Sequence, residues 1–277
     1  PVIPYFKPPV IELGPFTLEV FGLFVAAGIL LASRIGGRAA RRDGLSEDVF
    51  LDYAPWGVGA GVVVGHLVHL FLYHPEELSK SPFQVFKVWE GLSSFGGLIG
   101  ALIAAAIFFR VRGLRFGDYA DTFGLAVPWG WAVARLGCFA VHDHPGVRTD
   151  FFLAVDFPVQ GYGGPRHDLG LYDALWLFGI SLLITWLWRN RRMTGRLLPL
   201  AALLYAPGRF VFDALRATDL SYVDARYLGL TPAQYFSMAL VVYGVVFLVR
   251  GHRRDQAAAP GSPAGAASPR PAPRSKG

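Results

Sequence analysis

Two arginines, Arg135 and Arg209, lie inside long apolar runs of the sequence, in WGWAVARLGCFAV and LLYAPGRFVFDAL. A charged side chain in such a run costs free energy unless it faces a cavity or a partner. Tyr205, Asp213 and Arg216 lie at i−4, i+4 and i+7 from Arg209, which places all four on one face of a helix. Two guanidinium groups at one cavity favour a phosphate, because their planar forks match its oxygen atoms. The alternative is a structural Arg–Asp pair that joins helices.

Histidine is the second residue type with a marked distribution. Six of the seven histidines lie near or beyond those ends of the apolar runs that face one side of the membrane. They are His66, His69, His74, His142, His144 and His167. With Asp143, a set such as His66, His69, His142 and His144 could ligate zinc. No spacing here matches a compact metal motif, so the alternative is that each histidine is hydrogen-bonded separately.

The elements that must position these side chains are membrane helices. The chain has 277 residues, of which 53% are hydrophobic and 17% are charged, against about 25% charged in soluble domains. Its apolar residues fall in blocks near the length of about 20 residues that spans a bilayer. This excludes a soluble enzyme, a disordered chain and a disulfide scaffold. We expect an all-α integral membrane protein with about seven transmembrane helices, at roughly 15–33, 49–73, 92–109, 119–141, 170–188, 197–215 and 231–249.

The positive charges predict how these helices are oriented. Seventeen of the 26 Lys and Arg residues fall in one alternating set of connections and in the C-terminal segment, and seven fall in the other set. By the positive-inside rule, the N-terminus lies outside and the C-terminus lies in the cytoplasm. The net charge of +6 is therefore a topology signal and predicts no nucleic-acid partner.

The amino-acid composition divides the chain into two segments. Residues 1–250 form one membrane domain, with no internal repeat. Residues 251–277 are basic and rich in Ala, Pro, Gly and Ser, so we expect a disordered cytoplasmic tail.

Several segments resemble the prolipoprotein diacylglyceryl transferase family, in the family's order and over about residues 9–249. They are LEVFGL (18–23), VWEGLSSFGGLIG (88–100), ARLGCFAVHDHPG (134–146), RHDLGLYD (166–173) and YAPGRFVFDALR (205–216). The third resembles the signature Gly-Arg-x-Gly-Asn-Phe-x-Asn-Gly-Glu-x-x-Gly. The fifth resembles the element Tyr-x-x-x-Arg-x-x-x-Glu-x-x-Arg.

The resemblance implies a multi-pass enzyme of the bacterial cytoplasmic (inner) membrane whose site opens toward the outer half. Family members transfer the diacylglyceryl group of phosphatidylglycerol to the lipobox cysteine of a prolipoprotein, and glycerol 1-phosphate leaves. The implied partners are phosphatidylglycerol, the prolipoprotein signal peptide and the bilayer. No cofactor is implied, and seven spans suffice for a monomer.

The resemblance also implies residue roles. Arg135 and Arg209 would bind and neutralise the phosphate, Tyr205 would orient it, and Asp213 would hold Arg209. Asp143 would lie beside the reacting glyceryl group, and Gly146 would leave room for the headgroup or a loop. The matched motifs add Gly96, Gly97 and Arg216 to the expected substrate-binding residues.

The sequence departs from the family pattern close to the expected chemistry. Phe95 occupies the place of a histidine, so His142, His144 or His69 would have to supply a base near neutral pH. Asp143 and Asp213 each replace a longer glutamate. Four more positions carry other residue types than the family pattern, namely Phe21, His66, Cys138 and His142.

These departures leave three hypotheses open. The first is a diacylglyceryl transferase with a rearranged site. The second is a related phospholipid enzyme with a histidine-rich, metal-binding site. The third is a non-catalytic paralogue that binds lipid or a lipoprotein.

Overall fold

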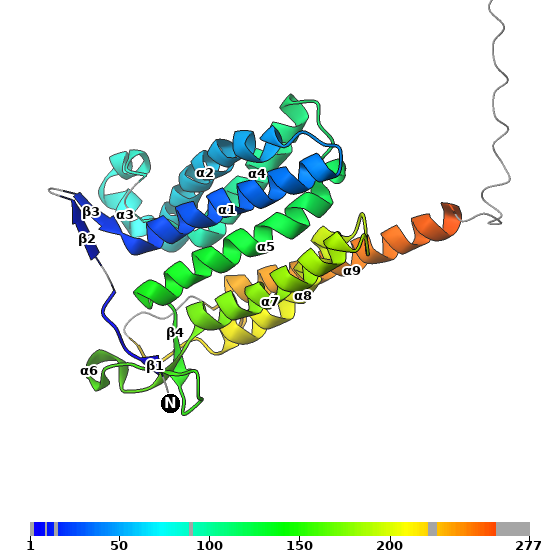
Figure 1. The fold of residues 1–277 in the computed structure, drawn as a ribbon. Helices are drawn as coiled ribbons and strands as arrows, with labels where there is room; N and C mark the ends of the chain where they lie inside the picture. The colour runs from blue at the N-terminus through cyan, green and yellow to red at the C-terminus, as the bar shows by residue number, and fades with distance from the viewer. Residues whose placement is uncertain (1–2, 9, 14–15, 89–90, 221–225, 259–277) are drawn as a thin grey trace, which may run out of the picture.

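The computed structural model describes residues 3–8, 10–13, 16–88, 91–220 and 226–258, and is mostly helical (Figure 1). The helices are α1 (Val20–Arg42), α2 (Asp48–Val68), α3 (Pro75–Lys80), α4 (Ser94–Val111), α5 (Phe116–Val141), α6 (Val159–Tyr162), α7 (Leu169–Arg189), α8 (Leu197–Ala214) and α9 (Pro232–Ala258). A π-helical turn (His69–Tyr73) extends α2, and a 3-10 helix (Pro82–Phe86) follows α3. Among the described helices, six are long and apolar enough to cross a membrane, and Phe95–Val111 is a shorter apolar helix. The predicted multi-pass helical architecture is confirmed.

Helix α5 lies at the centre of the bundle. It packs against α1, α7 and α8, while α2 packs against α4 and α8 packs against α9 (Figure 1). Glycines permit close helix crossings: a Cβ atom on Gly28 of α1 would lie 2.4 Å from the carbonyl oxygen of Gly130 in α5. Small residues allow membrane helices to approach in this way, because lipid provides no hydrophobic drive for association.

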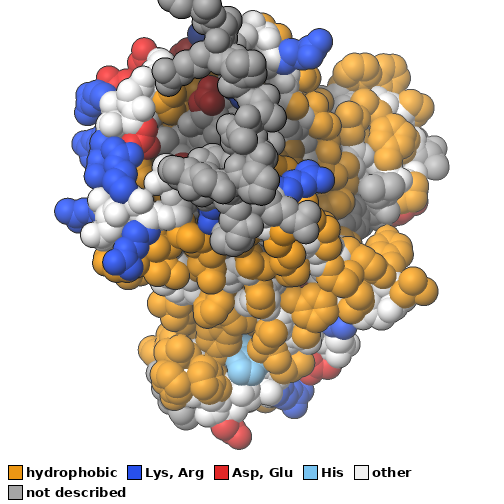
Figure 2. Space-filling model, turned by 90° about the vertical axis from the view of Figure 1, so that its right-hand side faces the viewer, with side chains coloured by type: hydrophobic (Ala, Val, Ile, Leu, Met, Phe, Trp, Pro, Cys, Tyr) orange, Lys and Arg blue, Asp and Glu red, His pale blue; other side chains and the backbone are white. Residues whose placement is uncertain are grey.

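The connections rich in arginine meet at one end of the bundle. Arg42, at the end of α1, donates a hydrogen bond of 3.2 Å to the carbonyl oxygen of Arg189, at the end of α7. Asp121 accepts a 2.9 Å hydrogen bond from the backbone N–H of Leu197, where α8 begins. Figure 2 shows hydrophobic side chains over most of the face in view, and many Lys and Arg side chains gathered toward its upper left.

A small β layer, which we did not predict, lies at the other end. The strands are β1 (Ile3–Pro4), β2 (Val10–Leu13), β3 (Phe16–Glu19), β4 (Pro145–Arg148), β5 (Val155–Asp156) and β6 (Arg166–Asp168). They form a sheet of order β1-β5-β6-β4 and a separate β2-β3 hairpin. Arg166 is buried and donates hydrogen bonds of 2.9 and 2.7 Å to the two carboxylate oxygens of Asp219 and one of 3.0 Å to the Gly146 carbonyl. This arginine holds the β layer against the segment that follows α8.

The predicted start and end of the first span were wrong, and α9 extends into the segment predicted as a tail. The first span was predicted over 15–33, but α1 begins at Val20 and continues to Arg42, because β3 occupies the residues before it. The tail was predicted to begin at residue 251, but α9 continues to Ala258. The rest of the predicted tail, 259–277, lies outside the described residues.

Gly130→Ala is expected to destabilise the bundle. The new methyl group would lie 2.6 Å from the carbonyl oxygen of Gly28, so α1 and α5 would have to separate. Overpacking of this kind costs about 1–3 kcal/mol, which a lower thermal unfolding midpoint in detergent would report. Gly59→Ala is the matched control, because nothing lies within 4 Å of a Cβ atom there. Equal midpoints for the two variants would contradict the close α1–α5 contact.

Candidate functional site

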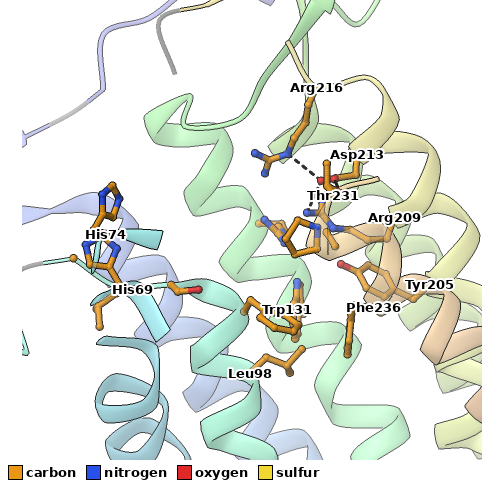
Figure 3. A pocket seen from close by; sticks show the side chains of 17 residues that line it. His69, His74, Leu98, Trp131, Tyr205, Arg209, Asp213, Arg216, Thr231 and Phe236 are labelled. Atoms are coloured by element: carbon orange, nitrogen blue, oxygen red, sulfur yellow. Dashed lines mark hydrogen bonds and ion pairs between the residues drawn. The ribbon is translucent and has the colours of Figure 1, made fainter. Parts of the chain in front are cut away.

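A cavity of about 460 Å³ opens at the end of the bundle that carries the β layer (Figure 3). Its walls come from the end of α2, the start of α4, the late turns of α5 and α8, and the start of α9. Arg135 and the four residues predicted to share a helical face, Tyr205, Arg209, Asp213 and Arg216, line it together. The structure therefore brings the two intramembrane arginines to one cavity, as the hypothesis of an anion site requires.

The arginines and two aspartates form one alternating network. Arg135 Nε lies 2.9 Å from Asp173 Oδ2, and Arg209 Nη1 lies 3.7 Å from the same oxygen. Asp213 Oδ1 accepts hydrogen bonds from Arg209 Nη2 at 3.0 Å and from Arg216 Nε at 2.9 Å. Three guanidinium groups thus share two carboxylates, which leaves a formal charge of +1 in the network. The structural Arg–Asp pairing that the sequence left open is therefore present, and it involves the same arginines that were predicted to bind an anion.

Helix α9 contributes to the network through its first turn. The Thr231 hydroxyl donates to Asp213 Oδ2, and it also accepts a 3.2 Å hydrogen bond from the backbone N–H of Gln234. The Gln234 side-chain oxygen in turn accepts a 3.0 Å hydrogen bond from the Thr231 backbone N–H, which completes a capping box. The start of α9 and the end of α8 are consequently fixed to each other at the cavity wall.

Asp173 is the functional residue that sequence reasoning missed. It is fully buried near the start of α7, and the Tyr205 hydroxyl lies 3.5 Å from its Oδ2 atom. A signal was available, because Asp173 is a lone carboxylate inside a predicted span, and such residues are expected to have a partner. The 166–173 motif ended at this residue without assigning it a role.

A carboxylate–imidazole pair adjoins the network just beyond α5. Asp143 Oδ1 lies 2.5 Å from His144 Nδ1, and His144 Nε2 lies 3.5 Å from Arg135 Nη1. Burial lowers the pKa of His144, and the nearby Arg135 and Arg216 add to this effect, while Asp143 opposes it. Asp143 is not among the residues that line the cavity, so it reaches the site through His144 and Arg135.

The predicted histidine ligand set does not come together. Both ring nitrogens of His66 lie against backbone carbonyls, those of Gly91 at 3.0 Å and Gln84 at 2.9 Å. In the part of the chain that the structure describes, the group with metal-ligand spacing is Cys138, Asp143 and His144, whose ligand atoms lie within 4.8 Å of one another.

That group is a poor site for a divalent cation. The guanidinium of Arg135 lies 3.6 Å from the Cys138 sulfur and 3.5 Å from His144 Nε2. A cation bound there would be adjacent to a fixed positive charge in a buried setting, where screening is weak. Cys138, Asp143 and His144 are therefore better suited to holding Arg135 in place than to binding a metal ion.

His142, a predicted catalytic residue, does not reach the cavity. Its Nδ1 atom lies 2.7 Å from Asp168 Oδ2, and its ring packs on Tyr5 and Phe6 at centroid distances of 5.1 and 4.4 Å. The residue ends α5 in the left-handed conformation, with a φ of 51°. This backbone turn directs the imidazole into an aromatic cluster under the β layer.

Three predicted substrate-binding glycines lie away from the arginine cavity, and two of them have packing roles. A Cβ atom on Gly146 would lie 2.8 Å from the Leu215 carbonyl oxygen, and one on Gly96 would lie 2.6 Å from Val68 Cβ. Gly97 lines a second, apolar cavity of about 400 Å³ between α1, α2, α4 and α5. None of the three lines the arginine cavity.

The departures from the family pattern fall at different distances from the arginines. Phe95 lines the cavity, so the position does face the site. Cys138 is buried beside Arg135. Phe21 lies on α1 against Gly137 of α5, where a Cβ atom would be 3.3 Å from its ring.

Comparison with known proteins matches residues 8–250 to the family described as prolipoprotein diacylglyceryl transferase. The chain is 33% identical over 254 residues to the phosphatidylglycerol–prolipoprotein diacylglyceryl transferase of Chromohalobacter salexigens, covering 91% of this chain and 94% of that protein. It is 32% identical to the enzyme of that name from Neisseria meningitidis serogroup B, covering 91% and 98%. It is 30% identical to the enzyme of that name from Cupriavidus metallidurans, covering 93% of this chain and 97% of that protein.

Asp173→Asn is expected to destabilise the protein strongly. The substitution keeps the shape but removes the negative charge that Arg135 and Arg209 share. Removing one partner of a buried ion pair costs about 3–5 kcal/mol, so the thermal unfolding midpoint in detergent should fall well below that of the unmodified protein. Asp156→Asn, at an exposed position in β5, is the control. If both variants unfold at the same temperature, Asp173 does not stabilise the arginines.

Proposed function

The chain belongs to the prolipoprotein diacylglyceryl transferase family, and from this premise we propose that the arginine-lined cavity is its active site. The enzyme transfers the diacylglyceryl group of phosphatidylglycerol to the cysteine of a prolipoprotein. In the reaction the thiol sulfur forms a bond to a glyceryl carbon, and the bond from that carbon to the phosphate oxygen breaks. Glycerol 1-phosphate departs with the electron pair of the broken bond.

The observation that carries this assignment is the formal charge of +1 in the buried Arg–Asp network. A phosphodiester brings one negative charge, and the departing phosphate gains a second as its bond to carbon breaks. Arg135 and Arg209, held by Asp173, offer donors that need no rearrangement when that charge develops. Preorganised donors of this kind stabilise a transition state more than a ground state.

The remaining predicted residues act around these two arginines in our proposal. Tyr205 orients the phosphate, and Arg216 extends the positive wall toward the outer end of α8. Asp143 is a positioning residue that acts through His144, which lies beside Arg135. This replaces the expectation that Asp143 lies beside the glyceryl group.

The orientation of the site is part of the proposal. The cavity lies at the end of the bundle opposite the arginine-rich connections, which the positive-inside rule places in the cytoplasm. We therefore place the site in the outer half of the bacterial cytoplasmic membrane, with the N-terminus outside. A prolipoprotein that has crossed the membrane would present its lipobox cysteine there, and a monomer suffices to enclose the site.

Arg209→Ala should abolish most of the turnover. Removing one preorganised donor lowers kcat by about 10²–10³-fold. The kcat of Arg209→Lys should lie between those of the unmodified enzyme and Arg209→Ala, because lysine keeps the charge but lacks the planar, two-pronged guanidinium. The assay uses the full chain in detergent with phosphatidylglycerol and a synthetic lipobox peptide, and mass spectrometry follows the peptide. Arg148→Ala is the control, since this arginine is exposed and does not line the cavity. Full activity in Arg209→Ala would overturn the site assignment.

The topology is tested by labelling introduced cysteines. Val159, in α6, is 78% exposed beside the β layer, and Thr194 is exposed in the α7–α8 connection. A membrane-impermeant maleimide added to intact spheroplasts should label Val159→Cys, and should label Thr194→Cys only after lysis. The native Cys138 is buried, so the unmodified protein measures the background. The reverse pattern would show that the cavity faces the cytoplasm.

A further inference from the structure

The proposed reaction requires a group that takes the proton of the acceptor thiol, since thiolate is the nucleophilic form of cysteine. Phenylalanine at position 95 cannot do this, although its side chain lines the cavity. We propose that His69 is the general base of this enzyme, an inference that rests on the proposed function. It assigns a catalytic role to the wall of the cavity that faces the arginines.

The direction of attack selects this wall. In a displacement at carbon, the nucleophile approaches from the side opposite the leaving group, so the thiol and the phosphate lie on opposite sides of the reacting carbon. The phosphate lies with Arg209 and its neighbours on one wall. Figure 3 shows His69 and His74 across the cavity from Arg209, Arg216 and Tyr205. A base at His69 is thus on the side from which the sulfur must come.

The surroundings of His69 fix its ring at the cavity edge. It begins the π turn after α2. A Cβ atom on Gly91 would lie only 2.1 Å from the Nε2 atom of His69. Gly91 has a φ of +79°, so both the backbone and the ring require glycine there. Glu77 Oε2 lies 4.0 Å from His69 Nε2, close enough to stabilise the imidazolium that proton transfer creates.

The other histidines near the site are less suited to this role. His66 has both ring nitrogens on backbone carbonyls. His74 also lines the cavity, but its Nδ1 atom is paired with Glu76 at 3.0 Å. His144 lies 3.5 Å from Arg135, on the side of the leaving group.

The proton and electron movements balance without a further reactant. His69 takes the thiol proton, and the sulfur electron pair forms the bond to the glyceryl carbon. The carbon–oxygen bond electrons leave with the phosphate, whose added charge Arg135 and Arg209 neutralise. The imidazolium then releases its proton to water, which returns the enzyme to its starting state. A positioned general base of this kind contributes about 10²–10⁴-fold.

The test compares two acceptor peptides on the same variant. His69→Gln should turn over a lipobox peptide at least about 100-fold more slowly than the unmodified enzyme. With selenocysteine in place of the acceptor cysteine, which is already ionised at neutral pH, the defect should shrink to a few-fold. His167→Gln is the matched control, because this histidine contacts the Tyr172 hydroxyl at 2.9 Å and does not line the cavity.

The outcomes separate this proposal from the assignment of the site. An unchanged rate in His69→Gln, or an equal loss with both peptides, would overturn the role of His69 while Arg209→Ala still reports on the cavity. Absence of turnover by the unmodified enzyme would instead count against the proposed function. If His69→Gln does not fold, as judged by its unfolding transition, His69→Asn undergoes the same comparison.

Discussion

A carboxylate shared between two arginines is the interaction on which the site depends. Asp173 lies between Arg135 of α5 and Arg209 of α8, so two guanidinium groups remain charged among apolar helices. Without it, the desolvation cost of Arg135 would lose the carboxylate that offsets it, while Arg209 would keep its pairing with Asp213 of the same helix. Because three helices contribute to one contact, the positions of α5, α7 and α8 and the charge of the cavity are set together.

The rest of the bundle supports that contact from several directions. Thr231 ties the first turn of α9 to Asp213, which links the network to a fourth helix. Gly28 and Gly130 let α1 approach α5 closely, so the helix that carries Arg135 is enclosed by its neighbours. At the end of the bundle that carries the β layer, the buried Arg166 joins this layer to the residues that follow α8. The buried Arg166, Arg209, Asp173 and Asp213 are therefore each paired with an opposite charge.

The sequence was most informative where a single element carried the pattern. Tyr205, Arg209 and Asp213 share α8, so their spacing was enough to predict a common face, whereas Arg216 lies two residues past the end of α8 and lines the same cavity from there. Asp173 was missed because its partners lie on other helices, and no local spacing reports such a contact. For the histidines, local spacing suggested a contact that the structure does not have. Helical spacing groups His66 with His69, but both ring nitrogens of His66 lie against backbone carbonyls that follow α2 in the chain. The left-handed end of α5 redirected His142 in a way that residue type alone does not reveal.

The π turn at His69–Tyr73 has a consequence for how such a cavity can change over evolution. A π turn corresponds to an α-helix into which one residue has been inserted. One inserted or deleted residue rotates the residues that directly continue the helix by about 100° relative to the helix before it. Here that would reorient His74 and α3 while α2 and the arginine wall kept their places. A single length change would thus alter one wall of the cavity without any substitution in the opposite wall.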